Sequence, residues 1–320
     1  MKKKRDPTLV GLAVALPVFL IAGWFLPNWL QSLLVLALGK GLVVVGLVLL
    51  MRTGLVSFGQ GLYYCIGAYA AVSVGRIFKL PDSILTSDVI VMPLFGGLVA
   101  GIVALVLGFL LAKYRAIFFA MLSLAFSMIL YGLLVKVSVL GSSDGFNLAY
   151  TTVAGITVPP AAHLYALYAV SVVMVFVTAF ALHRYLRSHF GRLAEAVRDN
   201  ELRVEYMGSS VRYVVHVNYV IAAVLAGVGG GLVGLSIGHV DPDLAYWTTS
   251  GEFVFVAVLG GTGNVAAPIL ASIVFEWIKS AAYQYAPYTW QMVLGISLLL
   301  VIMFLPAGLW SVFKRRAKGA

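Results

Sequence analysis

The chain has 320 residues, of which 62% are hydrophobic and 11% are charged, whereas an ordinary soluble domain has about 25% charged residues. This composition excludes a soluble globular protein, and the single cysteine excludes a disulfide-rich one. The net charge of +10 would suggest nucleic-acid binding in a soluble chain. Here the basic residues lie between and beyond the apolar stretches, as in the cytoplasmic loops of membrane proteins. The sequence therefore predicts one transmembrane domain, residues 1–320, and no nucleic-acid partner.

About nine stretches of the chain are apolar and approach the length of ~20 residues that a helix needs to cross a bilayer. These windows cover residues 8–26, 29–51, 55–75, 89–112, 116–135, 161–182, 213–238, 253–278 and 288–310.

Basic residues flank the first and the last window: Lys2, Lys3, Lys4 and Arg5 before it, and Lys314, Arg315, Arg316 and Lys318 after it. The positive-inside rule places both termini in the cytoplasm, which requires an even number of crossings. One window must then be a re-entrant hairpin or a pair of crossings. The predicted fold is an all-α polytopic membrane bundle with cytoplasmic N- and C-termini and at least one glycine-broken or re-entrant segment.

In the second window, Lys40 lies about ten residues from either end. A charge near the bilayer centre costs at least ~2.5–3.5 kcal/mol. Two interpretations stay open. Lys40 either has a structural role, in which it snorkels or pairs with an acid on a neighbouring helix, or faces a wet path and attracts a carboxylate or carbonyl group of a solute.

Residues 183–212 form the one long polar stretch between windows, with six arginines and four acids. Within it, residues 193–207 are good helix formers with Ala194, Val197, Val204 and Met207 roughly on one stripe, and Gly208 follows at a C-cap position. We expect one short amphipathic cytoplasmic helix. It either lies in the lipid headgroups or docks a soluble partner, and the four acids favour docking because an anionic leaflet repels carboxylates.

The window 213–238 is rich in small-xxx-small spacings, among them Gly227 with Gly231 and Gly230 with Gly234. Such spacing indicates close helix packing. The neighbour is either another helix of this chain or a second subunit, and packing within the chain is favoured.

The window 253–278 is interrupted by Gly260, Gly261, Gly263 and Asn264. A helix over residues 253–259 would rise only ~10 Å, so we expect two half-helices that meet at this break. If window 55–75 failed to cross instead, the six arginines of 183–212 would face outward. Non-helical backbone at membrane depth is tolerated only inside protein or along a wet cavity. The break is therefore predicted to border a translocation path.

No sequence motif indicates catalysis. The pair Gly39 and Lys40 has Leu34 where a phosphate-binding loop needs its first glycine. The five histidines have no metal-ligand spacing. We expect no enzyme, no metal and no cofactor bound by this chain.

Several short motifs, in this order along the chain, resemble those of the branched-chain amino acid type permeases of ABC importers. The first two are Gly54-Leu55-Val56-Ser57-Phe58-Gly59-Gln60 with Ile66-Gly67-Ala68-Tyr69, and Phe118-Phe119-Ala120-Met121 with Leu124-Ala125-Phe126. The next are Ser143-Asp144-Gly145, and Phe190-Gly191-Arg192 with Ala196-Val197-Arg198-Asp199-Asn200-Glu201 and Met207-Gly208. The last are Ala226-Gly227-Val228-Gly229-Gly230 and Val258-Leu259-Gly260-Gly261-Thr262-Gly263-Asn264. The long outer loop and the single cytoplasmic segment look like the LivM-type rather than the LivH-type subunit.

The resemblance implies a multi-pass permease of the bacterial inner membrane, in contact with membrane lipid. It would pair with a second, LivH-like permease, two cytoplasmic ATPase subunits that use ATP and Mg, and a periplasmic solute-binding protein. Carried onto this sequence, it assigns the ATPase-coupling interface to Glu195, Arg198, Asp199, Asn200, Glu201 and Gly208. Two positions depart from many relatives: Gln60 stands in place of a histidine, and Arg52 in place of an aromatic residue.

We further expect a wet path between the two permeases. Its candidate residues are Lys40, Ser57, Gly59, Gln60, Gly260, Gly261, Gly263 and Asn264. Free backbone groups at broken helices can hydrate a zwitterion. The resemblance implies branched-chain or other hydrophobic amino acids as the solutes. Urea, amides and small aromatic acids are alternative solutes within the same family.

A different class, a secondary transporter driven by an ion gradient, usually has intramembrane acids. Here Glu252 and Glu276 are the acids nearest a window, and both stand near its ends. A scaffold without transport would leave the broken window unexplained.

Overall fold

The computed structural model describes the chain except for residues 1–6, 78–87, 149–151, 160–161, 305–307 and 309–320. The basic residues 2–5 and 314–318, on which the predicted cytoplasmic termini depend, lie outside the described residues. The sidedness of the termini stays a prediction.

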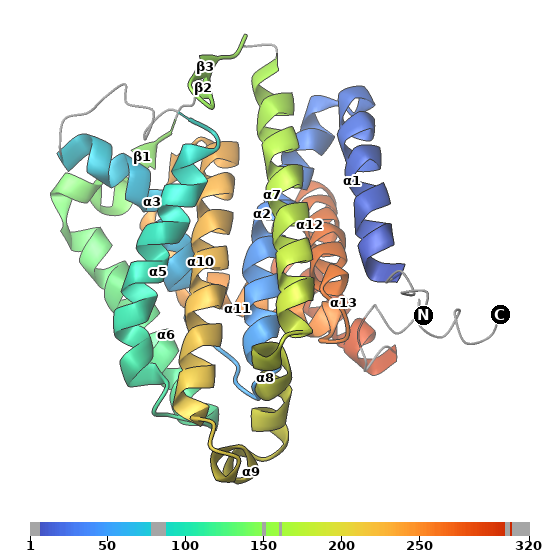
Figure 1. Cartoon of the computed structure of the whole chain (residues 1–320). Coiled ribbons are helices and arrows are strands. Elements are labelled where there is room, and N and C mark those ends of the chain that lie inside the picture. The colour runs from blue at the N-terminus through green and yellow to red at the C-terminus, as the bar shows by residue number, and fades with distance from the viewer. Residues whose placement is uncertain (1–6, 78–87, 149–151, 160–161, 305–307, 309–320) are drawn as a thin grey trace.

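The described chain is a bundle of helices with a few short strands at one end (Figure 1). The helices are α1 (Pro7–Phe25), α2 (Asn28–Met51), α3 (Gln60–Ile77), α5 (Val91–Leu111), α6 (Ala116–Lys136), α7 (His163–Leu186), α8 (His189–Asp199), α9 (Glu201–Tyr206), α10 (Val211–Ile237), α11 (Trp247–Gly260), α12 (Ala266–Tyr285) and α13 (Trp290–Phe304). The strands are β1 (Phe146–Asn147), β2 (Thr152–Val153), β3 (Ile156–Thr157) and β4 (His239–Val240). Strand β1 pairs antiparallel with β4, and β2 with β3.

Among the described residues, five helices, α2, α5, α6, α7 and α10, are long and apolar enough to cross a membrane. Large apolar side chains cover the outer faces of α5 and α6, among them Phe109, Phe118 and Met121. An apolar surface of this extent suits lipid rather than water. The prediction of an all-α polytopic membrane protein is confirmed.

Helix α10 is the centre of the bundle and packs against α5, α2 and α3. A methyl group added at Gly230 would collide with the backbone oxygen of Tyr64 in α3, and one at Gly229 with that of Gly39 in α2. At Gly227 it would lie 2.7 Å from the backbone oxygen of Gly96 in α5. These glycines therefore pack within the chain, as the small-residue spacing predicted.

Replacing Gly230 by alanine should strongly destabilise the protein, because the new Cβ meets the backbone of Tyr64 and helices α3 and α10 would have to separate. Overpacking of this kind costs about 1–3 kcal/mol or more. Gly132→Ala in α6 is the matched control, since its Cβ would meet open space, and alanine should there be neutral or favourable by up to ~1 kcal/mol. Thermal unfolding of the two purified variants in one detergent distinguishes them, and equal melting temperatures would contradict the packing.

The window 253–278 is broken where the glycines predicted, because α11 ends at Gly260 and α12 begins at Ala266. Gly261 caps α11 with a φ of 78°, a conformation that glycine adopts without strain. The first half-helix is longer than expected: α11 begins at Trp247 and its 14 residues rise about 21 Å. Window 55–75 is also only partly helical, since α3 begins at Gln60 after non-helical residues 55–59.

Residues 193–207 do not form the single helix that we expected. Helix α8 ends at Asp199, and Asn200 starts α9 by accepting a hydrogen bond from the backbone N–H of Arg203 (3.0 Å). Asparagine is a strong N-cap residue, so its side chain competes with continuation of the helix. Ala194, Val197 and Val204 are buried as the stripe predicted, but Met207 is exposed.

Candidate functional site

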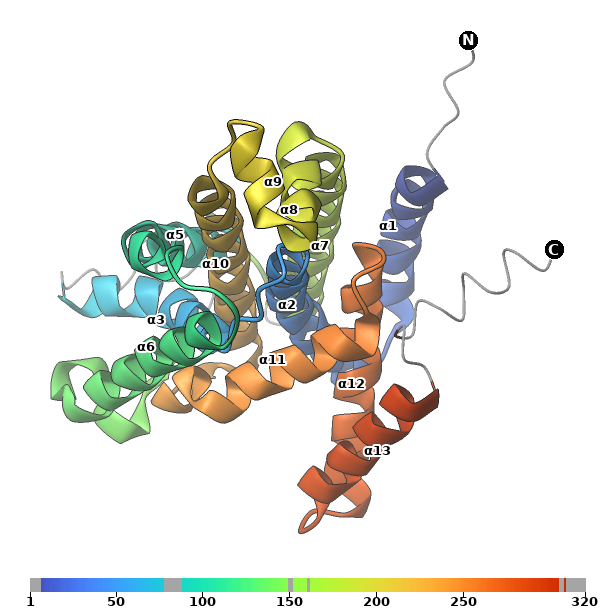
Figure 2. The same ribbon diagram turned by 90° about the horizontal axis from the view of Figure 1, so that it is seen from below.

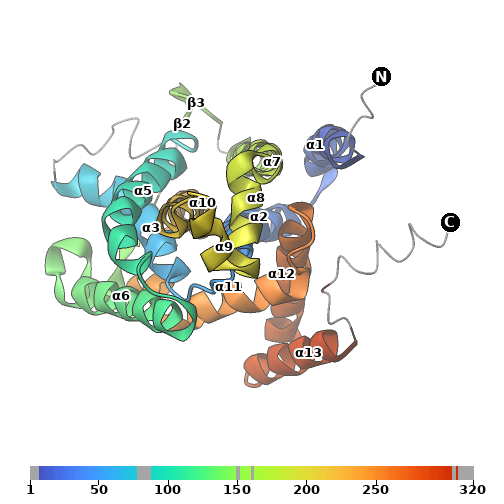
Figure 3. The same cartoon turned by 60° about the horizontal axis from the view of Figure 1, so that its bottom comes forward.

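Helices α8 and α9 lie side by side at the end of the bundle opposite β2 and β3, over the end of α2 and between α7 and α10 (Figures 1 and 3). The start of α8 is fixed by Ser188, whose hydroxyl accepts from the backbone N–H of Gly191 (3.4 Å). The end of α9 is fixed by Gly208, at a φ of 82°. All six residues predicted for the coupling interface are in or next to these two helices: Glu195, Arg198, Asp199, Asn200, Glu201 and Gly208.

The tip of this segment also exposes three large apolar side chains that were not among the residues predicted for the coupling interface. Leu202 is 66% exposed, Tyr206 90% and Met207 63%. All three lie within the polar stretch 183–212, where large apolar side chains between charged residues were the signal for an exposed contact surface. They give its outer surface an apolar contact area beside charged residues, the combination found at protein interfaces.

Two arginines from other parts of the chain hold the segment in place. Arg52, directly after α2, donates to Glu195 of α8 through Nη1 (2.9 Å). Arg115, directly before α6, donates through Nε to both carboxylate oxygens of Glu201 in α9 (2.8 and 3.0 Å). Burial lowers the pKa of the Arg52 guanidinium, while the Glu195 carboxylate raises it, and an arginine stays protonated throughout the physiological range.

A second group of polar residues lies where the start of α3 meets α6 and α11. Its members share complete or nearly complete burial: Ser57, Gly59, Gln60, Ser123, Ser127 and Ser250. Ser250 of α11 accepts from the backbone N–H of Gly61 (3.0 Å), and Ser123 of α6 accepts from that of Phe58 (3.2 Å). These hydroxyls satisfy backbone groups that the irregular start of α3 leaves without helical partners.

Gln60 itself is fully buried, and neither its amide nitrogen nor its amide oxygen has a hydrogen-bond partner in the described part of the chain. An unpaired buried amide is costly, and such exceptions are most often explained by function or by bound water. Among the candidate path residues, Gln60 therefore stands out by its unsatisfied buried side chain.

Lys40 is held by acids on two neighbouring helices. Its Nζ lies 2.7 Å from Glu276 Oε1 of α12 and 3.3 Å from Glu252 Oε2 of α11. Lys279 Nζ lies 2.5 Å from the other oxygen of Glu252. We refer to these four residues as the charge cluster. Of the two interpretations of Lys40, pairing with acids is confirmed.

The sequence analysis placed Glu252 and Glu276 near the ends of a window, and that placement is wrong. Glu276 is the eleventh of the 20 residues of α12, and both acids reach the middle of α2. The error has a physical reason, because α11 begins six residues before the window and α12 extends seven residues beyond it. The two acids nonetheless provide no open cation site of the kind used by ion-driven transporters, since two lysines balance them.

The break between α11 and α12 lies apart from the buried serines. Arg52 Nη2 donates to the Thr262 carbonyl oxygen (2.7 Å), so the break is level with the end of α2, twelve residues or about 18 Å along the helix from Lys40. Figures 2 and 3 show α11 lying between α6 and α12. Gly260, Gly261, Gly263 and Asn264 are thus at the end of the bundle that bears α8 and α9, whereas Ser57, Gly59 and Gln60 are deeper.

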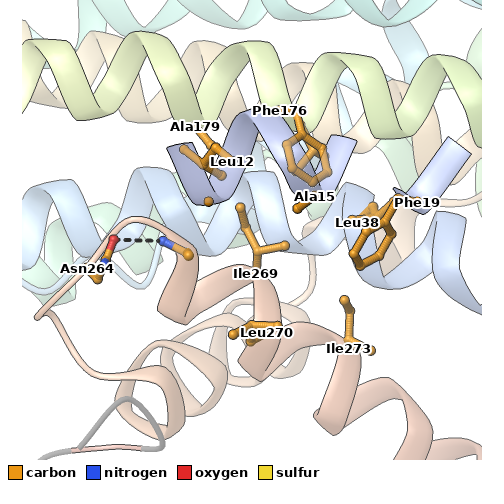
Figure 4. Close-up of a pocket in the computed structure, with 13 residues that line it drawn as sticks. Leu12, Ala15, Phe19, Leu38, Phe176, Ala179, Asn264, Ile269, Leu270 and Ile273 are labelled. Carbon is orange, nitrogen blue, oxygen red and sulfur yellow. Dashed lines mark hydrogen bonds between the residues drawn. The ribbon is translucent and has the colours of Figure 1, made fainter. Parts of the chain in front are cut away.

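Asn264 borders a cavity of about 450 Å³ between α1, α2, α7 and α12 (Figure 4). Its side-chain oxygen accepts from the backbone N–H of Ala266 (3.3 Å) and so turns to the start of α12. The other lining residues are apolar, among them Leu12, Phe19 and Ile269. Such walls cannot stabilise an ion or a zwitterion, so this cavity is no part of a polar path.

Comparison with known proteins agrees with this arrangement. Residues 29–303 match the family described as "Branched-chain amino acid transport system / permease component". The chain is 28% identical over 97% of its length, and 75% of the relative's, to the high-affinity branched-chain amino acid transport system permease protein LivM of Escherichia coli. It is 25% identical to LivH of Salmonella typhimurium over 53% of this chain and 51% of the relative. It is 26% identical to BraD of Pseudomonas aeruginosa over 43% of this chain and 45% of the relative. No solved structure matches the chain.

The greater coverage by LivM than by LivH confirms the LivM-like resemblance. With a family match that extends from α2 into α13, this chain belongs to the permease component family of branched-chain amino acid transport systems.

Proposed function

We propose that this chain is the LivM-like permease subunit of an ATP-driven importer in a bacterial inner membrane. It forms the path with a second, LivH-like permease, and its solutes are branched-chain or other hydrophobic amino acids. Two ATPase subunits, which use ATP and Mg, bind on the side of α8 and α9, and a periplasmic solute-binding protein delivers the solute. The observation that carries the proposal is the family match over residues 29–303.

In this proposal, residues 238–260, which end with α11, and α12 are a pair of crossings. The 20 residues of α12 rise about 30 Å, the thickness of the hydrocarbon core, and α11 rises beside α2 from the charge cluster to the break. A pair makes the number of crossings even, so both termini lie on the side of α8 and α9. The path passes the buried serines and Gln60 and opens to the cytoplasm near Gly260, Gly261, Gly263 and Asn264.

The first test is affinity purification of the chain from its native membrane in mild detergent, with mass spectrometry of the proteins that come with it. A second permease and ATPase subunits are expected. If the chain emerges alone or only with copies of itself, the importer proposal fails. Uptake by proteoliposomes of the purified assembly, compared between leucine, urea and benzoate, then selects the solute class.

The docking side is tested by Tyr206→Ala. Tyr206 is 90% exposed at the tip of α9, so its loss should not change the melting temperature of the chain by itself, yet it should release the ATPase subunits. Truncating an aromatic anchor at an interface typically costs about 2 kcal/mol or more, which is roughly thirtyfold in affinity. Tyr288→Ala is the matched control, since Tyr288 is 98% exposed in the turn after α12, at the far end from the break. ATPase retention by Tyr206→Ala would exclude α9 from the interface.

A further inference from the structure

Arg52 joins three elements that are remote from one another in the sequence. It caps the end of α2, its Nη1 donates to Glu195 of α8 (2.9 Å), and its Nη2 donates to the backbone oxygen of Thr262 (2.7 Å) in the break between α11 and α12. The Arg52 side chain is only 15% exposed. A single guanidinium therefore connects the segment proposed to meet the ATPase with the broken helix.

The chemistry of both partners suits this connection. The Thr262 carbonyl lies beyond the last turn of α11, where helix geometry supplies no N–H partner. A guanidinium is planar and presents several N–H groups in a fixed fork, so it can bind two acceptors that lie in different directions. Hydrogen bonds from a charged donor are stronger than neutral ones and strengthen away from water.

The break is also the point at which α11 ends and α12 begins. Helix α11 carries Ser250, which holds the start of α3, and Glu252 of the charge cluster. Helix α12 carries Glu276 and Lys279 of the same cluster. A displacement of the break would therefore move both the hydroxyl that holds the start of α3 and the charged side chains that α11 and α12 contribute to the charge cluster.

Arg115 makes a similar ion pair without this connection. It binds Glu201 through Nε, and its Nη1 donates to the backbone oxygens of Ala112 (2.7 Å) and Tyr114 (2.9 Å). Those oxygens belong to the turn between α5 and α6. Arg115 thus fastens α9 to a neighbouring turn, while Arg52 links α8 to the break.

We propose that Arg52 is a positioning residue that transmits movement of α8 to the break between α11 and α12, and so couples the ATPase cycle to the path. The proposal rests on the proposed function. Because the Arg52 side chain binds both α8 and the break, the position of the break depends on the position of α8.

Cysteine labelling provides the test. Cys65 is the only cysteine and is buried, so Cys65→Ala gives a cysteine-free background. Thr262→Cys then adds one partly exposed thiol at the break and keeps the backbone oxygen that Arg52 binds. The rate of reaction with a water-soluble maleimide is measured on the assembly that co-purifies with the chain, with and without ATP and Mg.

With Arg52 intact, nucleotide should change the labelling rate at position 262. Arg52→Gln should abolish that change while ATP hydrolysis continues, and Arg52→Lys, which keeps the charge, should restore part of it. Arg115→Gln, which breaks the comparable ion pair, should leave the nucleotide-dependent change in place. A nucleotide response that survives Arg52→Gln, or that Arg115→Gln removes equally, would overturn the proposal.

A second arm separates this inference from the proposed function. In the isolated chain, without nucleotide, Arg52→Gln should raise the labelling rate at position 262, because the break loses its tether, and Arg115→Gln should not. Absence of an ATPase from the purified assembly defeats the proposed function. Unchanged labelling in the isolated Arg52→Gln chain defeats the link itself.

Discussion

Lys40→Met is expected to lower the free energy of unfolding more than any other single change in the charge cluster. Lys40 contacts both Glu276 and Glu252, and only Lys279 would remain to balance two carboxylates. Removing one member of a buried ion pair typically costs about 3–5 kcal/mol, because it leaves an uncompensated charge. The Glu276 side chain is 9% exposed and that of Lys40 16%, so water offers little compensation. Thermal unfolding in detergent measures the loss.

A double variant shows whether charge balance is the cause. Adding Glu276→Gln to Lys40→Met leaves one lysine and one glutamate, already paired as Lys279 and Glu252, and should recover much of the lost stability. Lys136→Met, at an exposed position at the end of α6, is the control and should change stability by no more than ~0.5 kcal/mol. If Lys40→Met unfolds like the unmodified protein, or the double variant is worse than the single one, the cluster does not hold these helices together.

Gln60→Leu is expected to raise stability and to slow transport. The Gln60 amide is buried without a partner among the described residues, and an unsatisfied buried group costs about 1–3 kcal/mol that leucine would not. If the same amide binds solute or its water along the path, the rate of uptake should fall by about tenfold. A tenfold decrease in rate corresponds to an activation free energy that is higher by ~1.4 kcal/mol. Melting temperature and uptake by proteoliposomes of the assembly would therefore change in opposite directions.

Gln31→Leu is the matched control for this second prediction. Gln31 is also buried, but its amide donates to the backbone oxygens of Gly23 and Leu26, both at 3.0 Å. Leucine there should lower stability and leave uptake per folded assembly unchanged. A Gln60→Leu protein that is less stable, or that transports at the full rate, would remove Gln60 from the path.

The helix break and the internal glycine packing could be predicted from the sequence because both follow from local composition. Gly260, Gly261, Gly263 and Asn264 all have low helix propensity and stand together in a short stretch, and glycines four residues apart share one face of a helix. The division at Asn200 was also within reach, since asparagine followed by glutamate is an N-terminal signal. The apolar stripe continues past Asn200 and favours a single helix instead.

The charge cluster and the Arg52 link could not be predicted in the same way. Lys40 and Glu276 are 236 residues apart, and Arg52 and Thr262 are 210 apart, so only the tertiary packing brings them together. The buried serines of α6 gave no signal either. That helix is apolar on nearly every side, and periodicity cannot tell which of its faces turns inward.

The direct backbone contacts of α10 separate a rigid part of the molecule from a movable one. Helices α2, α3, α5 and α10 meet through glycines, where no side chain can rotate to absorb a displacement. Helix α11 also packs through apolar side chains, but it adds polar contacts that can exchange partners, from Ser250 to the backbone N–H of Gly61 and from Glu252 to Lys40. We therefore expect α2, α3, α5 and α10 to keep their positions relative to one another during transport, while α11 and α12 tilt against them.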